Sequence, residues 1–267
     1  MKNSVYFYLI LTILVINACQ SPESQQAIVN EPQEENPAIP GFNAKGSDPK
    51  AIELADAVMK AMGGRENWDQ TRYTTWKFFG NRKHTWDRYT GDVKIEYTQD
   101  TVSERVVLLN VNTMEGKVQH NGEAFSDADS VAVLLQQAKG QWINDSYWVF
   151  MPFKMKDSGV TLKYVGTDST LAGVPCEVVS MTFSEVGNTP DNKYLVYIHP
   201  ESHDVLQWDY YPTVTDESPR FVSSWDAYKT YGNIRLSSDR VFNGEAMRKL
   251  EELAVLDSLS EGFFKEF

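Results

Sequence analysis

Hydrophobic residues recur every three to four positions between residues 47 and 64, and every second position from Tyr73 onward. The first pattern predicts an amphipathic helix that begins at the cap Ser47-Asp48-Pro49 and ends at Gly63-Gly64. The second pattern predicts β-strands with one aromatic face and one polar face. The folded part of the chain is therefore expected to open with a helix and to continue as a sheet.

The alternating segments predict a large antiparallel meander. Asn121-Gly122 is a strong signal for a two-residue hairpin turn within it. Strands are expected at residues 73–87, 93–97, 105–111, 116–120, 160–165, 176–183, 194–199, 205–211, 221–228 and 234–240.

Further helices are expected in the middle of the chain and at its end. Asp127 caps an apolar run that ends at Gly140, and residues 144–150 form a second short helix stopped by Pro152. Asn243 caps a last apolar run that reaches Leu256. The prediction is a mainly β protein with a single domain over residues 47–267, of a size ordinary for a barrel or a sandwich.

The first 18 residues have the layout of a signal peptide, with Lys2 followed by an apolar run and small Ala18 directly before Cys19. This junction resembles the bacterial lipobox, in which the cysteine sulfur receives diacylglycerol and the chain is cut before it. Cys19 is therefore the expected site of lipid attachment, and several acyl chains would make the anchor effectively permanent. The alternative is an ordinary signal peptide followed by a chance cysteine.

Residues 19–46 are expected to form a flexible acidic tether. They are rich in Ser, Gln, Glu, Asn and Pro and have almost no periodic apolar positions. Such a tether would hold the folded domain away from a membrane. The chain is then expected in the cell envelope, lipid-anchored, with the outer membrane of a Gram-negative cell as the predicted site; the residues do not specify the leaflet.

The net charge of −12 argues against binding to nucleic acid, which draws its affinity from clustered Lys and Arg. It also argues against electrostatic docking to an anionic membrane surface. Cys176 has no cysteine partner in the mature chain once Cys19 is acylated, and its apolar neighbours predict a buried strand thiol.

The layout of an N-terminal helix, a long meander and a mid-chain helical segment on a secreted lipoprotein resembles the lipoprotein-carrier superfamily typified by LolA and LolB. Short motifs over roughly residues 48–240 are also similar to a subgroup of Gram-negative lipoproteins of unknown function. These motifs are Gly63-Gly64 with Trp68, His84-Thr85-Trp86-Asp87, residues 147–159 (YWVFMPFKMKDSG) and residues 189–194 (TPDNKY).

The resemblance implies a half-open barrel, in which an unclosed sheet curls around an apolar cavity and helices plug the mouth. It also implies a lipid or another hydrophobic small molecule as the ligand. Because this chain is itself expected to be acylated, an anchored acceptor or sensor fits better than a soluble shuttle. The sequence does not identify a protein partner.

A curled sheet with an aromatic inner face can enclose a hydrophobic ligand. The residues predicted to line such a cavity are Trp76, Phe78, His84, Trp86, Ile95, Tyr97, Met181, Phe183, Trp208 and Tyr210. The alternative is that these side chains fill the interior completely, which would leave a structural or interaction lipoprotein.

No cofactor and no metal are expected, and an enzymatic function is the second alternative. The best polar cluster runs from His199 to Asp204 and contains His203 and Glu201, so a metal-dependent hydrolase is conceivable. The cluster lies between two alternating strands, where a hairpin tip is the simpler interpretation. His84 and Asp87 have opposite strand parity and are not expected to form a catalytic pair. Asp191, Asp209 and Asp226 are candidates for the two carboxylates of a glycosidase, but in a chain with 37 acidic residues a solvated surface is the simpler interpretation. The predicted function is non-catalytic binding of a hydrophobic ligand.

Overall fold

The structure of this protein, a computed structural model, describes residues 34–97, 104–184 and 191–267. The helices are α1 (Pro49–Ala61), α2 (Arg65–Gln70) and α3 (Ala128–Phe150), followed by the 3-10 helix η1 (Met151–Phe153). The strands are β1 (Tyr73–Phe78), β2 (Arg82–Asp87), β3 (Asp92–Tyr97), β4 (Arg105–Asn110), β5 (Gly116–His120), β6 (Glu123–Ala124), β7 (Val160–Ser169), β8 (Pro175–Phe183), β9 (Lys193–Ile198), β10 (Val205–Tyr211), β11 (Phe221–Ser224), β12 (Asp226–Tyr231), β13 (Ile234–Phe242) and β14 (Ala246–Leu256).

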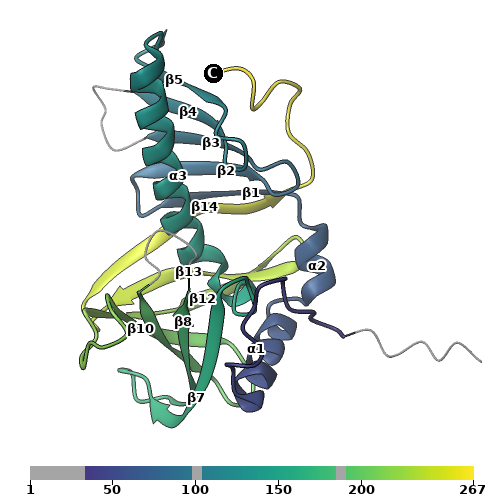
Figure 1. The fold of residues 1–267 in the computed structure, drawn as a ribbon, viewed down its shortest axis with the longest axis vertical. Helices are drawn as coiled ribbons and strands as arrows, with labels where there is room; N and C mark the ends of the chain where they lie inside the picture. Colours follow the sequence, from purple (N-terminus) through teal and green to yellow (C-terminus); the bar gives the residue numbers. More distant parts are fainter. Residues whose placement is uncertain (1–33, 98–103, 185–190) are drawn as a thin grey trace, which may run out of the picture. The chain divides into compact units, whose positions relative to one another are not determined.

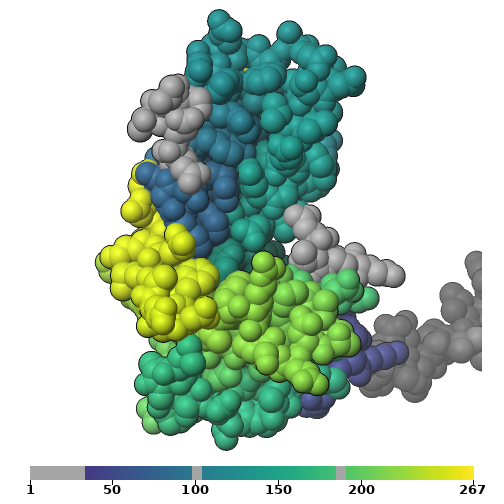
Figure 2. Space-filling view, turned by 90° about the vertical axis from the view of Figure 1, so that its left-hand side faces the viewer, coloured from purple at the N-terminus to yellow at the C-terminus, as the bar shows by residue number. Residues whose placement is uncertain are grey.

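The fourteen strands of the described residues form one sheet in the order β6-β5-β4-β3-β2-β1-β14-β13-β11-β10-β9-β8-β7, with β12 paired to β13 off this path. The meander is interrupted where β14 lies between β1 and β13. Both views show the yellow C-terminal residues between the blue first strands and the green later strands (Figures 1 and 2). The edge strands β6 and β7 are not paired with each other, so the sheet is open. The expected mainly β, half-open architecture is confirmed.

The expected C-terminal helix is wrong, because residues 246–256 form strand β14. Leu250 and Leu253 are both buried, three positions apart, which imitates the spacing of a helix. The pairing of β14 with β1 shifts register at this point, and Glu252 has a φ of +49°. A β-bulge of this kind adds one residue to the strand and returns Leu253 to the face of Leu250.

Helix α3 is continuous over 23 residues, whereas the sequence pattern predicts a helix ending at Gly140 and a separate short one. Asp127 caps it as expected, since its carboxylate accepts a hydrogen bond from the Ser130 N–H. A glycine inside a helix costs about 1 kcal/mol, which the packing of buried Leu135 and Trp148 on either side of it offsets. The helix crosses one face of the sheet from β5 to β13 (Figure 1).

The folded unit begins at Glu34, earlier than the composition predicts. The Ile39 N–H donates to the Lys156 carbonyl, and the Asn43 N–H donates to the Val160 carbonyl at the edge of β7. Lys156, of which 5% is exposed, also donates to the Glu34 carboxylate at 2.8 Å. Residues 34–46 are therefore held against the sheet and are not part of a free tether.

The signal peptide expected at residues 1–18, the lipid-attachment site Cys19 and the tether up to residue 33 lie outside the described residues. Among the helices that the structure describes, none combines the length and the apolar character needed to cross a membrane.

The main hydrophobic core joins the inner face of the sheet to α1, η1 and the C-terminal end of α3. A second cluster packs Leu135 and Ala138 of α3 against β3, β4 and β5. A small third cluster around Cys176 lies on the opposite face of β8 and β9. Cys176 is 2% exposed, as expected, and its burial raises the pKa of the thiol to about 11.

Candidate ligand-binding site

The space over the predicted aromatic inner face of the sheet is largely occupied by the protein's own side chains. Trp76 and Met181 are 0% exposed and Trp208 is 1% exposed. The last turns of α3 place Tyr147 and Trp148 over Trp208, with ring centroids 5.9 Å and 4.5 Å from it. The centre of the half-barrel is therefore a packed core rather than an open hollow.

The ten residues predicted to line a cavity divide into two groups. Six are buried in the core: Trp76, Phe78, His84, Ile95, Met181 and Trp208. Four are half-buried: Trp86, Tyr97, Phe183 and Tyr210. Phe183 lines one of the three pockets described below, and the other nine line none of them. Most of this set therefore belongs to the packed interior, and Phe183 is the member that lines the pocket beside α3.

An apolar pocket of about 190 Å³ lies between the C-terminal half of α3 and strands β7 and β8. The helix contributes side chains at i, i+1, i+4 and i+5, which share one face. The lining residues are Trp142, Ile143, Ser146 and Tyr147 of α3, Lys154, Asp157 and Ser158 of the turn after η1, Val160 of β7 and Phe183 of β8.

One ion pair supplies most of the polarity of this pocket. Lys154 Nζ lies 2.7 Å from Asp157 Oδ2, and both side chains are about one-third exposed. The Ser146 hydroxyl is engaged with the Ile143 carbonyl inside the helix. Burial raises the pKa of Tyr147 well above its ordinary value, so its hydroxyl is neutral. The pocket combines an apolar floor with a charged pair that reaches solvent.

Two other pockets have walls that are more polar than those of the pocket beside α3. One, of about 310 Å³, includes Asp92, Asn110, Glu115 and Lys117 on the outer side of β4 and β5. The other, of about 510 Å³, lies beside residues 34–36 and α2 and contains four carboxylates, two cations and two glycines. Hydrophobic ligands prefer mostly apolar walls with a few placed polar groups, so the pocket beside α3 is the candidate site.

His84 belongs to a buried polar cluster that the sequence does not reveal. Its Nε2 lies 2.8 Å from Asp145 Oδ2, and both side chains are 0% exposed. Arg82 donates to both oxygens of the same carboxylate, at 2.8 and 3.0 Å. The imidazole stacks on Trp76 with ring centroids 4.8 Å apart. Because Asp145 is on α3 and its partners are on β2, the cluster joins the helix to the sheet.

We expect the free energy of unfolding to decrease as the pH falls below about 6.5. Burial lowers the pKa of His84 and outweighs the opposing bond to Asp145. The unfolded chain therefore takes up a proton that the folded protein resists, with a slope of at most about 1.4 kcal/mol per pH unit. Asp145 acts in the same direction at lower pH: burial raises its pKa, but the bonds from His84 and Arg82 lower it further.

Urea unfolding between about pH 7.5 and 5 measures this slope. His84→Gln keeps a side-chain donor near Asp145 but removes the titrating group, so its slope should be smaller than that of the unsubstituted protein. Equal slopes for the two proteins would show that His84 does not resist protonation.

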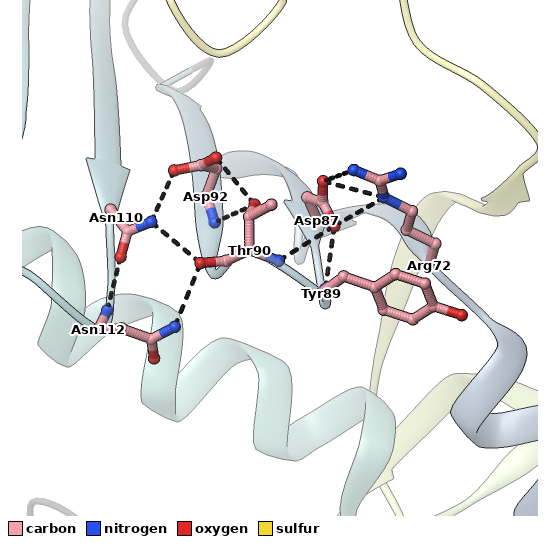
Figure 3. Close-up of polar contacts among 7 residues, drawn as sticks. All are labelled: Arg72, Asp87, Tyr89, Thr90, Asp92, Asn110 and Asn112. Carbon is pink, nitrogen blue, oxygen red and sulfur yellow. Dashed lines mark hydrogen bonds and ion pairs between the residues drawn. The ribbon is translucent and has the colours of Figure 1, made fainter.

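The His84-Thr85-Trp86-Asp87 motif ends in a turn that Asp87 organises. Asp87 accepts hydrogen bonds from Nε and Nη2 of the Arg72 guanidinium and also accepts from the Tyr89 N–H. Thr90 then connects this turn to Asn110, which donates to the Thr90 carbonyl (Figure 3). His84 and Asp87 point to different partners, as their parity predicts, and the motif is structural in this region.

The histidines at the β9–β10 turn are engaged in turn geometry. His199 Nδ1 accepts from the backbone N–H groups of Glu201 and Ser202, and His203 has a φ of +56°. Over the residues that the structure describes, His, Cys, Asp and Glu form no group of three or more placed to hold a metal ion.

Sequence reasoning missed the helical side of the candidate site. Trp142, Ser146, Ile143 and Tyr147 form i, i+4 pairs, a pattern that is visible only if α3 continues through Gly140. Ending the predicted helix at that glycine separated Trp142 and Ile143 from Tyr147.

No protein-family model matches the sequence, and no curated protein matches it. Solved structures with a similar chain path include the following two. A DUF1329 family protein from Desulfovibrio piger has 12% identity and a TM-score of 0.45, covering 82% of this chain and 98% of its own. A LolA superfamily protein from Nitrosomonas europaea has 6% identity and a TM-score of 0.38, covering 81% of this chain and 97% of its own. The functional argument below therefore rests on the residues of this chain.

Proposed function

We propose that this protein binds a hydrophobic ligand, without chemical conversion, in the pocket beside α3. The observation that carries the proposal is the lining of the pocket, where Trp142, Ile143, Tyr147 and Phe183 surround an apolar space next to the Lys154–Asp157 pair. Such a surface fits an amphiphile, with its hydrocarbon part against the rings and its polar head at the ion pair.

The volume of the pocket limits what enters it. A cavity of roughly 150 Å³ accepts a benzene molecule, so 190 Å³ accepts a short hydrocarbon segment or one small ring. A whole diacyl lipid does not fit inside it. The pocket is best suited to the part of a single chain that lies next to the head group.

We further propose that the protein is a lipoprotein of the cell envelope, acylated at Cys19. The support is the sequence of residues 1–19, with an apolar run and a small residue before the cysteine. An anchor at this position would keep the binding domain close to a membrane, which is the source of the amphiphile. The outer membrane of a Gram-negative cell remains the proposed location.

A pocket-filling substitution tests the binding function. Ile143→Trp should reduce labelling by a short photoreactive fatty acid, an octanoate with a diazirine at the chain end, by about tenfold, because the larger side chain occupies the pocket. Membranes from cells that produce the full chain are irradiated with the probe, and labelled peptides are identified by mass spectrometry. Label is expected on peptides that contain residues 142–147 and Phe183.

The matched control is Val133→Trp on the same helix, where the side chain is 57% exposed and lies outside the pocket. It should leave the labelling unchanged. Equal labelling of both variants, or labelled peptides scattered over the surface, would favour a filled barrel that acts as an interaction protein.

A further inference from the structure

Six half-buried aromatic side chains form a continuous row across the rim of the inner face. They follow the order Phe183 on β8, Tyr194 on β9, Tyr210 on β10, Phe221 on β11, Phe242 on β13 and Phe79 at the β1–β2 turn. Successive ring centroids are 5.9, 5.3, 4.9, 5.6 and 6.0 Å apart. We call this set the aromatic rim.

The aromatic rim begins at the wall of the candidate pocket. Phe183 lines that pocket, and Tyr147 of the same pocket contacts both Phe183 and Tyr194, with centroids 6.2 and 5.7 Å away. Trp148 lies against the far part of the row, 5.8 Å from Phe221 and 5.4 Å from Phe242. The row is therefore a strip of touching apolar rings that meets the pocket wall at Phe183 and packs against Trp148 at its far part.

The far end of the row is held in an unfavourable backbone conformation. Phe79 has a φ of +47° and is followed by Gly80 at +76°, as in a type I′ turn, where a bulky side chain is disfavoured. The turn after β5 uses Asn121 and Gly122 with nearly the same φ angles, +50° and +83°. The Phe79 ring packs against Phe78 and Trp148, with centroids 4.2 and 5.6 Å away, and these contacts help to offset the cost of the strained turn.

We propose that the aromatic rim binds the distal part of a long hydrocarbon chain, whose first segment occupies the pocket. This inference rests on the proposed function and adds the ligand class, a single-chain amphiphile selected for chain length. The head group lies at the Lys154–Asp157 pair, and the chain passes Phe183 and follows the rings towards Phe79. The flat apolar rings stabilise a chain along their length without any polar contact.

The experiment compares two photoreactive fatty acids, octanoate and hexadecanoate, each with a diazirine at the chain end, on the full chain in isolated membranes. Phe79→Asn should raise the half-saturating concentration of the long probe about fivefold and leave that of the short probe unchanged, because the rim loses one ring. Phe242→Ala should act in the same way. The long probe should label peptides of β11 or β13, and the short probe those of the pocket.

Phe79→Asn gives this turn the Asn-Gly pair of the other hairpin but removes ring contacts with Phe78 and Trp148. Its melting temperature is therefore measured in parallel, and unchanged binding of the short probe shows that the folded pocket is retained. Tyr89→Ala, an exposed aromatic outside the row, is the control and should alter neither probe. If the rim substitutions change the half-saturating concentrations of both probes equally, or change neither, the proposed role of the rim is overturned. Ile143→Trp still tests the pocket independently of the rim. If neither probe labels the pocket, the proposed function fails and this inference fails with it.

Discussion

Replacing Asp145 with asparagine is expected to lower the free energy of unfolding by about 2–4 kcal/mol. The carboxylate is 0% exposed and accepts from Arg82 and His84 at 2.8 Å each. Asparagine has one acceptor oxygen where the carboxylate has two, so at least one donor loses its partner. Breaking a buried pair costs about 3–5 kcal/mol, and the 19% exposure of Arg82 reduces this figure because water solvates part of the freed charge.

Urea unfolding near neutral pH measures the effect, and Asp69→Asn supplies the comparison. Asp69 also pairs with an arginine at 2.8 Å, but its side chain is 53% exposed. An exposed ion pair within one helix contributes less than about 0.5 kcal/mol to the free energy of unfolding. A loss of similar size in both variants would mean that the buried Asp145 cluster stabilises the fold no more than an exposed ion pair does.

The sheet was largely predictable because the period of two is a local signal. Trp76, Phe78, His84 and Trp86 share a parity and a face in the structure, as expected. The position of β14 was not predictable, because its place between β1 and β13 depends on contacts far apart in the chain. The bulge at Glu252 then gave the strand a spacing that imitates a helix.

The candidate site was harder to predict than the fold. Alternation identifies which residues share a face of a strand, but not what covers that face. Here Tyr147 and Trp148 of α3 cover the inner face, so most of the residues expected to contact the ligand belong to the hydrophobic core. The pocket lies beside α3 instead, at Phe183. Asp145 was also missed, because its partners Arg82 and His84 are more than 60 residues away.

Replacing Trp208 with alanine is expected to cost about 3–5 kcal/mol of folding free energy, as truncation of a large buried aromatic does. Its ring is 1% exposed and contacts Trp148, Tyr194 and Trp225 with centroids 4.5, 4.8 and 5.2 Å away. Truncating a residue that lined an open cavity would cost far less folding free energy, because few atoms would pack against its side chain. The size of this loss therefore separates a filled core from a hollow barrel.

Trp208→Phe is the matched variant. It keeps an aromatic ring in the core and removes an indole N–H that has no acceptor among the described residues, so relief of this buried donor offsets part of the lost packing. We expect it to cost about 1 kcal/mol. If thermal and urea unfolding show a small loss for both variants, the interior around Trp208 is loosely occupied, and the ligand has room there as well as in the pocket beside α3. A large loss for alanine with a small one for phenylalanine assigns Trp208 to the core that supports the site.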